Sequence, residues 1–135
     1  MIEIRLGAVS DLADLDSINK IVAYSNPSEF MEEAIDKGCI FVAAKDEDSV
    51  VGYGLIQFLW GDTPLLSLLK VLPEYQGTGI GTQLLAAVET KLSGEGHKSL
   101  FSSTDKTNEL SQRFHAKHGF EKIGELDMDL SLIHI

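Results

Sequence analysis

Residues 76–81, QGTGIG, place three glycines at alternate positions directly before a helical pattern. Apolar residues then recur at Ile80, Leu84, Val88 and Leu92, and they form one stripe along a helix. The first N–H groups of a helix have no intrahelical partner, and the helix dipole adds partial positive charge there. Glycines at this point let an anion, usually a phosphate, approach the backbone closely. The segment therefore predicts a phosphate-binding helix start, and a loop that merely needs positive φ is the simpler alternative.

Two common phosphate-binding patterns do not fit this segment. A P-loop ends in Gly-Lys-Ser or Gly-Lys-Thr, whereas here Gly81 is followed by Thr82 and Gln83. A dinucleotide-binding GxGxxG that starts at Gly77 would need its third glycine at Thr82, and the residues PEYQ separate the glycines from the preceding strand. A nucleotide-binding domain is therefore the weakest functional interpretation.

A second stretch with polar residues at helical spacing is NELSQRFHAKHGF, residues 108–120. On a helix, Asn108, Ser111 and His115 share one face. Histidine titrates near neutral pH, so His115 could act as a general acid. His115 and His118 have the spacing of some metal ligands, but no third ligand with suitable spacing is evident, and we expect no metal.

The elements that must position these residues follow from the periodicity of the chain. The expected strands are residues 2–6, 39–45, 50–60, 65–71, 99–103, 120–126 and 129–135. The expected helices are residues 10–25 with Ser10 as N-cap, 27–38, 80–93 and 108–119. Turns are expected at residues 46–49 and 61–64. The pattern predicts an α/β (α+β) fold in a single domain, residues 1–135.

The composition restricts the class of protein. A chain of 135 residues suits one domain. With 11 Lys and Arg against 21 Asp and Glu, the net charge of −10 argues against nucleic-acid binding; it is compatible with a cationic substrate and also simply favours solubility. No apolar run spans a bilayer and the N-terminus lacks a leader pattern, so we expect a cytoplasmic protein without membrane contact. The single Cys39 fits a reducing compartment and a core position.

The glycine segment and its flanks resemble a known family. In VLPEYQGTGIG, residues 71–81, Gln76, Gly79 and Gly81 match the pyrophosphate-binding signature of the GNAT superfamily of acyl-CoA-dependent N-acetyltransferases. The Pro, acidic and aromatic residues before Gln76 match the flank of that signature. Residues that match the family's later cofactor-binding segment are Asn108, Ser111, Phe114, Gly119 and Phe120. The resemblance covers nearly the whole chain and is weakest in the first sixty residues.

This resemblance implies the GNAT fold, a mixed, mostly antiparallel sheet of about seven strands with helices on both faces. It implies an acyltransferase that moves an acetyl group from acetyl-CoA to a primary amine of a small molecule, peptide or protein by direct attack. The residues expected to bind the cofactor are Leu69, Lys70, Val71, Gln76, Gly77, Thr78, Gly79, Ile80, Gly81, Thr82 and Asn108. The expected partner is the amine acceptor, and a homodimer is the alternative to a single-chain protein.

The chain departs from the family at the positions that carry chemistry. The family most often has a Tyr where this chain has His115, and that Tyr protonates the leaving thiolate. His115 either supplies the same proton or only packs against the cofactor. Many relatives also place a Glu as general base in the strand before the loop or at the end of the next strand, where this chain has Ser67, Lys70, Ser102 and Ser103.

Three carboxylates are the substitutes for the missing base, and each is also an ordinary surface carboxylate in the simpler interpretation. They are Glu29, Asp62 and Glu74. Tyr75 and Trp60 are expected to pack rather than to catalyse. Because the base and the usual Tyr are absent, an acyl-CoA-binding sensor or regulatory module without turnover is the alternative function.

Overall fold

The computed structural model describes residues 2–21, 28–46, 49–104 and 108–124, and for residues 20, 21 and 28–30 it gives the backbone alone. The chain forms two compact units, residues 1–103 and residues 104–135. The first unit holds the sheet and helices α1 to α3, and the second holds helix α4. Each unit is described by itself.

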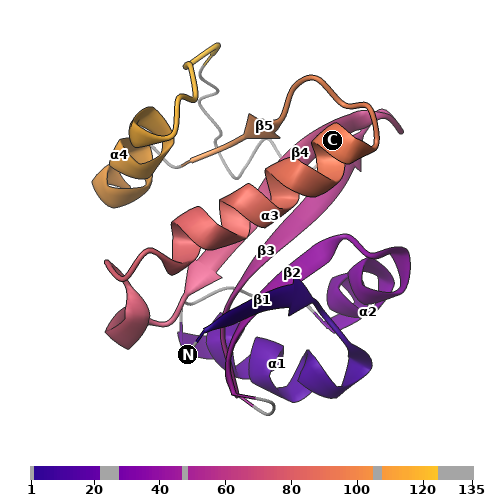
Figure 1. Ribbon diagram of the computed structural model, residues 1–135, viewed down its shortest axis with the longest axis vertical. Helices are drawn as coiled ribbons and strands as arrows, with labels where there is room; N and C mark the ends of the chain where they lie inside the picture. Colours follow the sequence, from indigo (N-terminus) through magenta and orange to yellow (C-terminus); the bar gives the residue numbers. More distant parts are fainter. Residues whose placement is uncertain (1, 22–27, 47–48, 105–107, 125–135) are drawn as a thin grey trace, which may run out of the picture. The chain divides into compact units, whose positions relative to one another are not determined.

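The first unit is built on a sheet with the strand order β1-β2-β3-β4-β5 (Figure 1). The strands are β1 Glu3–Leu6, β2 Ile40–Asp46, β3 Ser49–Leu59, β4 Thr63–Val71 and β5 Phe101–Ser102. Strands β1 to β4 pair antiparallel in chain order, and β5 joins β4 in parallel. The sheet is therefore mixed and mostly antiparallel, which confirms the predicted fold class.

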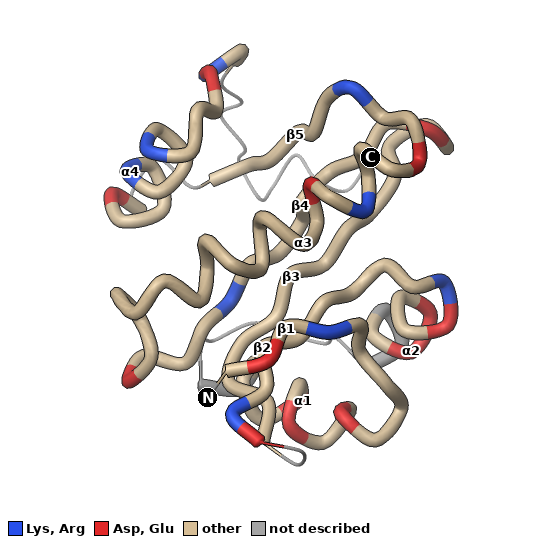
Figure 2. The backbone as a smooth tube through the Cα atoms, viewed as in Figure 1, with Lys and Arg blue, Asp and Glu red and all other residues tan. Residues whose placement is uncertain are grey.

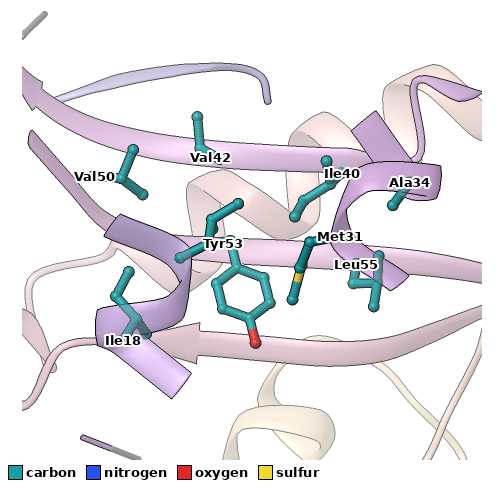
Figure 3. Close-up of a cluster of buried hydrophobic side chains, with 9 residues drawn as sticks. Ile18, Met31, Ala34, Ile40, Val42, Val50, Tyr53 and Leu55 are labelled. Carbon is teal, nitrogen blue, oxygen red and sulfur yellow. The ribbon is translucent and has the colours of Figure 1, made fainter. Parts of the chain in front are cut away.

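Helices cover both faces of this sheet (Figure 1). They are the 3₁₀ turn η1 Val9–Asp11, helix α1 Leu12–Ile21, helix α2 Ser28–Lys37, the 3₁₀ turn η2 Pro73–Tyr75 and helix α3 Ile80–Gly94. On one face, Leu15 and Ile18 of α1 and Met31 of α2 pack around the ring of Tyr53 from β3 (Figure 3). Burial of these large apolar side chains holds α1 and α2 on the sheet.

Helix α3 packs on the opposite face through its predicted apolar stripe. Ile80 and Leu84 pack with Ala43 of β2 and Val51 of β3. The whole predicted stripe is buried, namely Ile80, Leu84, Val88 and Leu92. Because Ile80 is the first residue of the helix, this packing fixes the point at which α3 begins and thereby the position of the glycine segment before it.

Helix α4, Glu109–Lys117, is the one helix in the described part of the second unit. Asn108 caps it, because its Oδ1 accepts a hydrogen bond of 3.0 Å from the backbone N–H of Ser111. Gly119 follows the helix with φ 83, the left-handed conformation common after helix ends. The predicted helix over residues 108–119 is therefore confirmed with its bounds shifted by one or two residues.

Two of the expected strands do not appear among the five that the structure describes. Residues 120–124 do not form a strand, although their sequence alternates. Alternation alone does not make a strand, because a strand also needs a paired neighbour. The other expected strand, residues 129–135, lies outside the described residues, as do residues 125 and 126.

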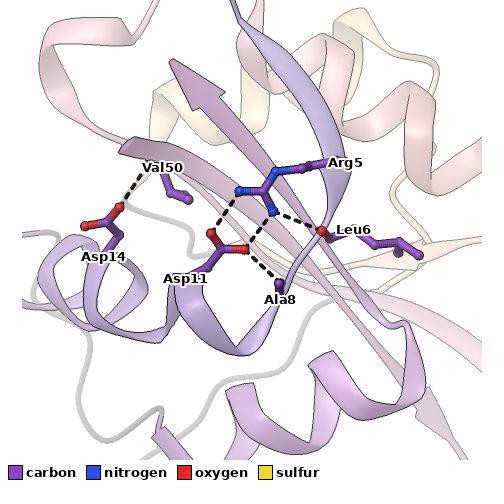
Figure 4. A network of polar contacts seen from close by, with 6 residues as sticks. All are labelled: Arg5, Leu6, Ala8, Asp11, Asp14 and Val50. Carbon is purple, nitrogen blue, oxygen red and sulfur yellow. Dashed lines mark hydrogen bonds and ion pairs between the residues drawn. The ribbon is translucent and has the colours of Figure 1, made fainter. Parts of the chain in front are cut away.

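Two predicted boundaries were wrong. Trp60, expected in a strand, lies in the β3–β4 turn with φ 52, followed by Gly61 with φ 85. Two successive positive φ values match the twist of a hairpin, so the turn takes Trp60 out of the strand. Ser10 is not an N-cap, because helical structure already begins with η1 and the Ala8 N–H donates to Asp11 Oδ2 at 2.7 Å instead (Figure 4).

Candidate functional site

The glycine segment joins η2 to α3 and contains two left-handed residues. Gly77 has φ 79, and Gly79, the N-cap of α3, has φ 89. A Cβ atom built on either glycine would meet no other atom within 4 Å. The turn therefore does need glycine for its backbone angles, as the simpler interpretation held. The space over both glycines is open as well, so a ligand has access to the backbone.

The backbone N–H groups of residues 77–81 have no acceptor among the described residues. No side chain caps α3, and its first turn holds no acidic residue. No charged side chain occurs between Glu74 and Glu89, so this stretch is uniformly tan in Figure 2. Unpaired N–H groups and the helix dipole make this end of α3 attractive to an anion, and no carboxylate of the segment occupies it.

Two side chains tie the glycine segment to the elements before it. Gln76 donates from Nε2 to the backbone oxygen of Val71, the last residue of β4, at 3.1 Å. Thr78 donates from its hydroxyl to the backbone oxygen of Tyr75. The start of the segment is therefore held against the end of β4 while its N–H groups stay open.

Strand β4 presents backbone groups at its outer edge next to this segment. Leu72 N–H donates to Val51 of β3 at 2.9 Å, so the backbone of Leu72 faces β3. Because backbone groups alternate in direction along a strand, those of Lys70 also face β3, and those of Leu69 and Val71 face away from it. Of the three strand residues predicted to bind cofactor, Leu69 therefore offers its N–H and carbonyl at the open edge, and Val71 offers its N–H, since its carbonyl accepts from Gln76.

The outer edge of β4 is open because β5 accompanies it only briefly. The parallel pairing covers Leu65 with Phe101 and Leu66 with Ser102. Directly after Leu66 the β3–β4 register shifts, and the extra residue of this bulge is Ser67, whose hydroxyl donates to the Leu55 carbonyl at 3.3 Å. A bulge bends its strand and is frequent beside functional sites. Within the described residues, the strand beyond Ser67 has a partner on the β3 side alone.

In the second unit, His115 is held by its own helix. Its Nδ1 lies 2.7 Å from the backbone oxygen of Ser111 and 3.4 Å from the Ser111 hydroxyl. A carbonyl oxygen can only accept, so Nδ1 is the donor in this contact. The ring of Phe120 stacks edge-on at 5.0 Å between centroids. His115 is thus oriented by Ser111 and Phe120.

The three candidate bases occupy different places. Asp62 lies in the β3–β4 turn, and nine residues of β4 separate it from the glycine segment, roughly 25 Å of strand. Glu74 lies in η2, immediately before the segment, and lines a cavity of about 280 Å³. The side chain of Glu29 lies outside the described residues. Of the two candidates whose side chains are described, Glu74 is therefore the one next to the glycine segment, and Asp62 lies at the opposite end of β4.

Cys39 is half-buried beside the core of α1 and α2. Burial raises the pKa of its thiol, so it is a poor nucleophile at neutral pH, as expected. No group of three or more His, Cys, Asp or Glu that could hold a metal occurs in the described part of the chain. Among the helices with described residues, none has the length and apolar character needed to cross a membrane.

Sequence reasoning missed two polar residues on α1. Asp14 accepts a hydrogen bond of 3.0 Å from the Val50 N–H and lines the same cavity as Glu74. Asn19 is 1% exposed; its Oδ1 accepts from the Tyr53 hydroxyl, and its Nδ2 has no partner among the residues that the structure describes. A polar residue four positions after Leu15 on the apolar stripe is the signal that could have identified Asn19. Asp14 carried no such signal, because its partner is far away in the sequence.

Comparison with known sequences identifies one family. The sequence signature of the Acetyltransferase (GNAT) family matches residues 9–120. An uncharacterized N-acetyltransferase of Mycobacterium tuberculosis is 29% identical over 109 residues, which cover 79% of this chain and 69% of that protein. An uncharacterized N-acetyltransferase of Mycobacterium bovis matches to the same extent, 29% over 109 residues.

Solved structures share the fold. An acetyltransferase of the GNAT family from Bacillus cereus superposes with a TM-score of 0.79 at 25% identity, covering 94% of this chain and 87% of that one. The aminoglycoside N-acetyltransferase AAC(6')-Iy in complex with CoA gives a TM-score of 0.80 at 20% identity, covering 96% and 93%. The PaiA N-acetyltransferase from Thermoplasma acidophilum, in complex with coenzyme A, gives 0.73 at 21% identity, covering 94% and 93%.

Proposed function

Because the chain belongs to the acetyltransferase (GNAT) family, we propose that it transfers an acetyl group from acetyl-CoA to a primary amine of a small molecule, peptide or protein. The observation that carries this proposal is the open start of α3, where the N–H groups of residues 77–81 have no acceptor in the described part of the chain, next to the open edge of β4. A ligand that carries both a phosphate and a chain of amides needs an anion site for the phosphate and an open strand edge for the amides, and the two must be adjacent.

In this proposal the cofactor follows the open backbone. The N–H groups of residues 77–82 bind the pyrophosphate, and Gln76 holds them in place through Val71. The edge groups of Leu69 and the N–H of Val71, whose carbonyl accepts from Gln76, pair with the pantetheine amides as an added strand would. Acetyl-CoA supplies an activated acyl group whose thiolate is a good leaving group. The chain's own contribution is to hold this group at a fixed place and to move protons.

The reaction needs two proton transfers. The amine nitrogen attacks the thioester carbonyl carbon, the carbon–sulfur bond breaks, the nitrogen loses a proton and the thiolate gains one. The carboxylates that could accept the amine's proton through water are the predicted candidates Glu29, Asp62 and Glu74, of which Glu74 lies in η2 at the pyrophosphate end of the proposed cofactor. We assign the gain to His115, whose Nε2 donates when the ring is charged because Nδ1 is held by Ser111. Asn108 is proposed to contact the pantetheine with its amide nitrogen, since its Oδ1 caps α4.

Binding calorimetry with CoA and acetyl-CoA tests the proposal, with NAD and ATP as matched nucleotides. We expect CoA to bind and to raise the unfolding temperature with concentration, while NAD and ATP do little at equal concentration. Tight binding of NAD without binding of CoA would contradict the proposed function. Binding of acetyl-CoA without transfer to any of a broad panel of amines would favour the sensor without turnover.

The remaining predictions about the whole molecule are proposals of the same kind. A single domain of residues 1–135 predicts one cooperative unfolding transition in calorimetry. A homodimer predicts twice the chain mass in light scattering. A cytoplasmic location predicts that the protein fractionates with the cytosol.

A further inference from the structure

The tip of the β3–β4 hairpin holds an exposed tryptophan in an uncommon backbone conformation. Trp60 and Gly61 are the central residues of a turn, which the Asp62 N–H closes by donating to the Leu59 carbonyl at 3.3 Å. Such a turn usually has Asn, Asp or Gly where Trp60 has φ 52, because a bulky side chain is strained there. The sequence predicts that Trp60 packs, but it is 89% exposed, so no packing within the chain offsets this strain.

Trp60 ends a run of three exposed apolar side chains. Phe58 is 37% exposed and Leu59 is 36% exposed. Successive side chains of a strand point to opposite faces, so Phe58 and Leu59 lie on the two faces of the hairpin and Trp60 lies at its end. Adjacent exposed apolar side chains mark a surface that contacts another molecule, and tryptophan is typical of the residues that dominate such contacts.

The charges around this tip are balanced. Asp62 lies in the turn itself, and Lys98 follows the histidine whose ring lies 5.5 Å from that of Phe58 between centroids. The connection after α3 thus brings Lys98 to the same end of the hairpin (Figure 1). Glu95 of this connection pairs with Lys91 at 3.0 Å, whereas Asp62 and Lys98 form no ion pair within the described residues. The tip therefore offers one acidic and one basic group beside its apolar side chains.

We propose that this tip binds the same tip of a second copy of this chain around a two-fold axis. Each contact of a two-fold interface occurs twice, so Asp62 of either copy meets Lys98 of the partner subunit while the two Trp60 side chains pack together. A strongly basic or acidic partner would match one of these charges and oppose the other. An anionic membrane would repel a chain with a net charge of −10. The homodimer proposed above thereby gains a defined surface, which does not depend on acetyl transfer.

The size of this surface predicts a weak dimer. The exposed parts of the three apolar side chains amount to roughly 350 Å² per copy, since one buried aromatic side chain accounts for about 150–250 Å². Interfaces of this size are transient, so we expect a dissociation constant of about 10–100 µM. The nine residues of β4, roughly 25 Å, separate the tip from the glycine segment, so the start of α3 stays open in both copies.

The test uses the fact that Trp60 is the one tryptophan of the chain, so that tryptophan fluorescence reports on the tip alone. Sedimentation equilibrium and emission spectra are measured on the full chain from about 1 to about 500 µM. We expect the mass to double over this range and the emission to shift to shorter wavelength in parallel, because association buries the indole. CoA affinity should be the same for monomer and dimer.

Two substitutions of exposed apolar residues separate the tip from the rest of the first unit. Trp60→Asn should weaken association at least about 10-fold, because it removes the central apolar side chain. It should also raise the unfolding temperature of the monomer, because Asn suits this turn. Val9→Asn is the matched control, since Val9 is 71% exposed on η1, and it should leave association unchanged.

Charge reversal tests the two-fold arrangement. Asp62→Lys alone and Lys98→Asp alone should each weaken association about 10-fold, because equal charges then face each other. An equimolar mixture of these two variants should associate as strongly as the wild type, since every charge then meets its opposite across the interface. The double variant should also recover the wild-type strength.

Several results would overturn the proposal. They are a monomeric mass at every concentration, a doubled mass with unchanged Trp60 emission, equal association of Trp60→Asn and the wild type, and no recovery in the mixture of charge variants. A doubled mass in Trp60→Asn would leave the homodimer in place and assign it to another surface. Failure of CoA to bind would contradict the proposed acetyl transfer and leave the dimer surface unaffected.

Discussion

The two ends of helix α3 have the same kind of glycine and opposite hydrogen bonding. Gly79 at the start has φ 89, Gly96 after the end has φ 90, and a Cβ on either would meet nothing within 4 Å. At the C-terminal end the chain closes on itself, because Glu95 N–H donates to Leu92 at 3.1 Å and His97 N–H donates to the same carbonyl at 3.0 Å. At the N-terminal end the N–H groups have no acceptor among the described residues.

This difference separates a structural glycine from one that is available to a ligand. A left-handed glycine that closes a helix is explained by the hydrogen bonds it permits. At Gly79 the carbonyl accepts from the Gln83 N–H at 3.1 Å, and the N–H groups of the segment have no acceptor among the described residues, as is usual at a helix start. Conformation at a glycine therefore says little about function until the partners of the neighbouring backbone groups are known.

The strongest test of this comparison is the same substitution at both ends. Asn tolerates the left-handed conformation, so Gly79→Asn and Gly96→Asn should both fold. We expect Gly79→Asn to weaken CoA binding about 100-fold, because a side chain occupies the space where phosphate meets the N–H groups, and loss of one charge-assisted hydrogen bond or more costs about 2.7 kcal/mol. Gly96→Asn should leave the affinity within about twofold. Equal affinities in calorimetry would mean that the glycines only form a turn.

A second prediction separates binding at the open end from chemistry at His115. His115→Ala should lower the rate of acetyl transfer about 10²-fold with CoA affinity nearly unchanged, because a group that protonates the thiolate acts in the transition state. His115→Tyr should retain more activity. His118→Ala is the control, since His118 is the C-cap of the same helix and packs on Phe114 at 4.4 Å between centroids. Loss of an imidazolium would appear on the alkaline limb of the rate profile, because the amine's own titration shapes the acidic limb.

An Ala variant as fast as the wild type across the pH range would mean that His115 is structural and that water supplies the proton. Equal rate losses in His115→Ala and His118→Ala would point to damage to α4 rather than to a catalytic proton. Steady-state rates with the acceptor identified from the amine panel, measured together with CoA affinity, distinguish these outcomes.

Much of the open end could be predicted from the sequence, because its determinants are local. Glycines at alternate positions, the stripe that starts at Ile80 and the absence of charge all lie within one short segment. Asp14 and the open edge of β4 could not be predicted in this way. Asp14 depends on Val50 across the fold, and the edge depends on β5 leaving β4 after Leu66. Such contacts are set by packing of distant elements and leave no periodic signal.

Breaking the Arg5–Asp11 pair should lower the free energy of unfolding without affecting either end of α3. The Arg5 hydrogen bonds lower the pKa of Asp11, burial raises it, and the Ala8 N–H lowers it further. Asp11→Asn should cost about 2 kcal/mol of unfolding free energy at pH 7, below the value for a fully buried pair because Arg5 is partly exposed. CoA affinity should not change. A shift in CoA affinity in this variant would show that stability and binding are coupled, and the comparison of the glycines would then need correction for it.

The pH dependence of this pair has a defined sign. The folded pKa of Asp11 is lowered, so its contribution to stability is complete above the unfolded pKa and is lost as the pH falls through the folded value. The difference between wild type and Asp11→Asn should therefore be constant near neutral pH and shrink below about pH 4. Urea unfolding at a series of pH values measures it. A difference that grows toward acid pH would contradict the assignment.

The smallest expected effect tests the phosphate site most specifically, because one substitution should raise the free energy of unfolding and lower CoA affinity. Thr82→Asp places a carboxylate in the first turn of α3, which should stabilise the free protein by about 0.5 kcal/mol through the helix dipole. The same carboxylate repels a phosphate, so CoA affinity should fall about 10-fold. Ser93→Asp, in the last turn of α3, should destabilise by about 0.5 kcal/mol and leave CoA affinity unchanged. If Thr82→Asp stabilised the protein without weakening CoA, the open end of α3 would not be the phosphate site.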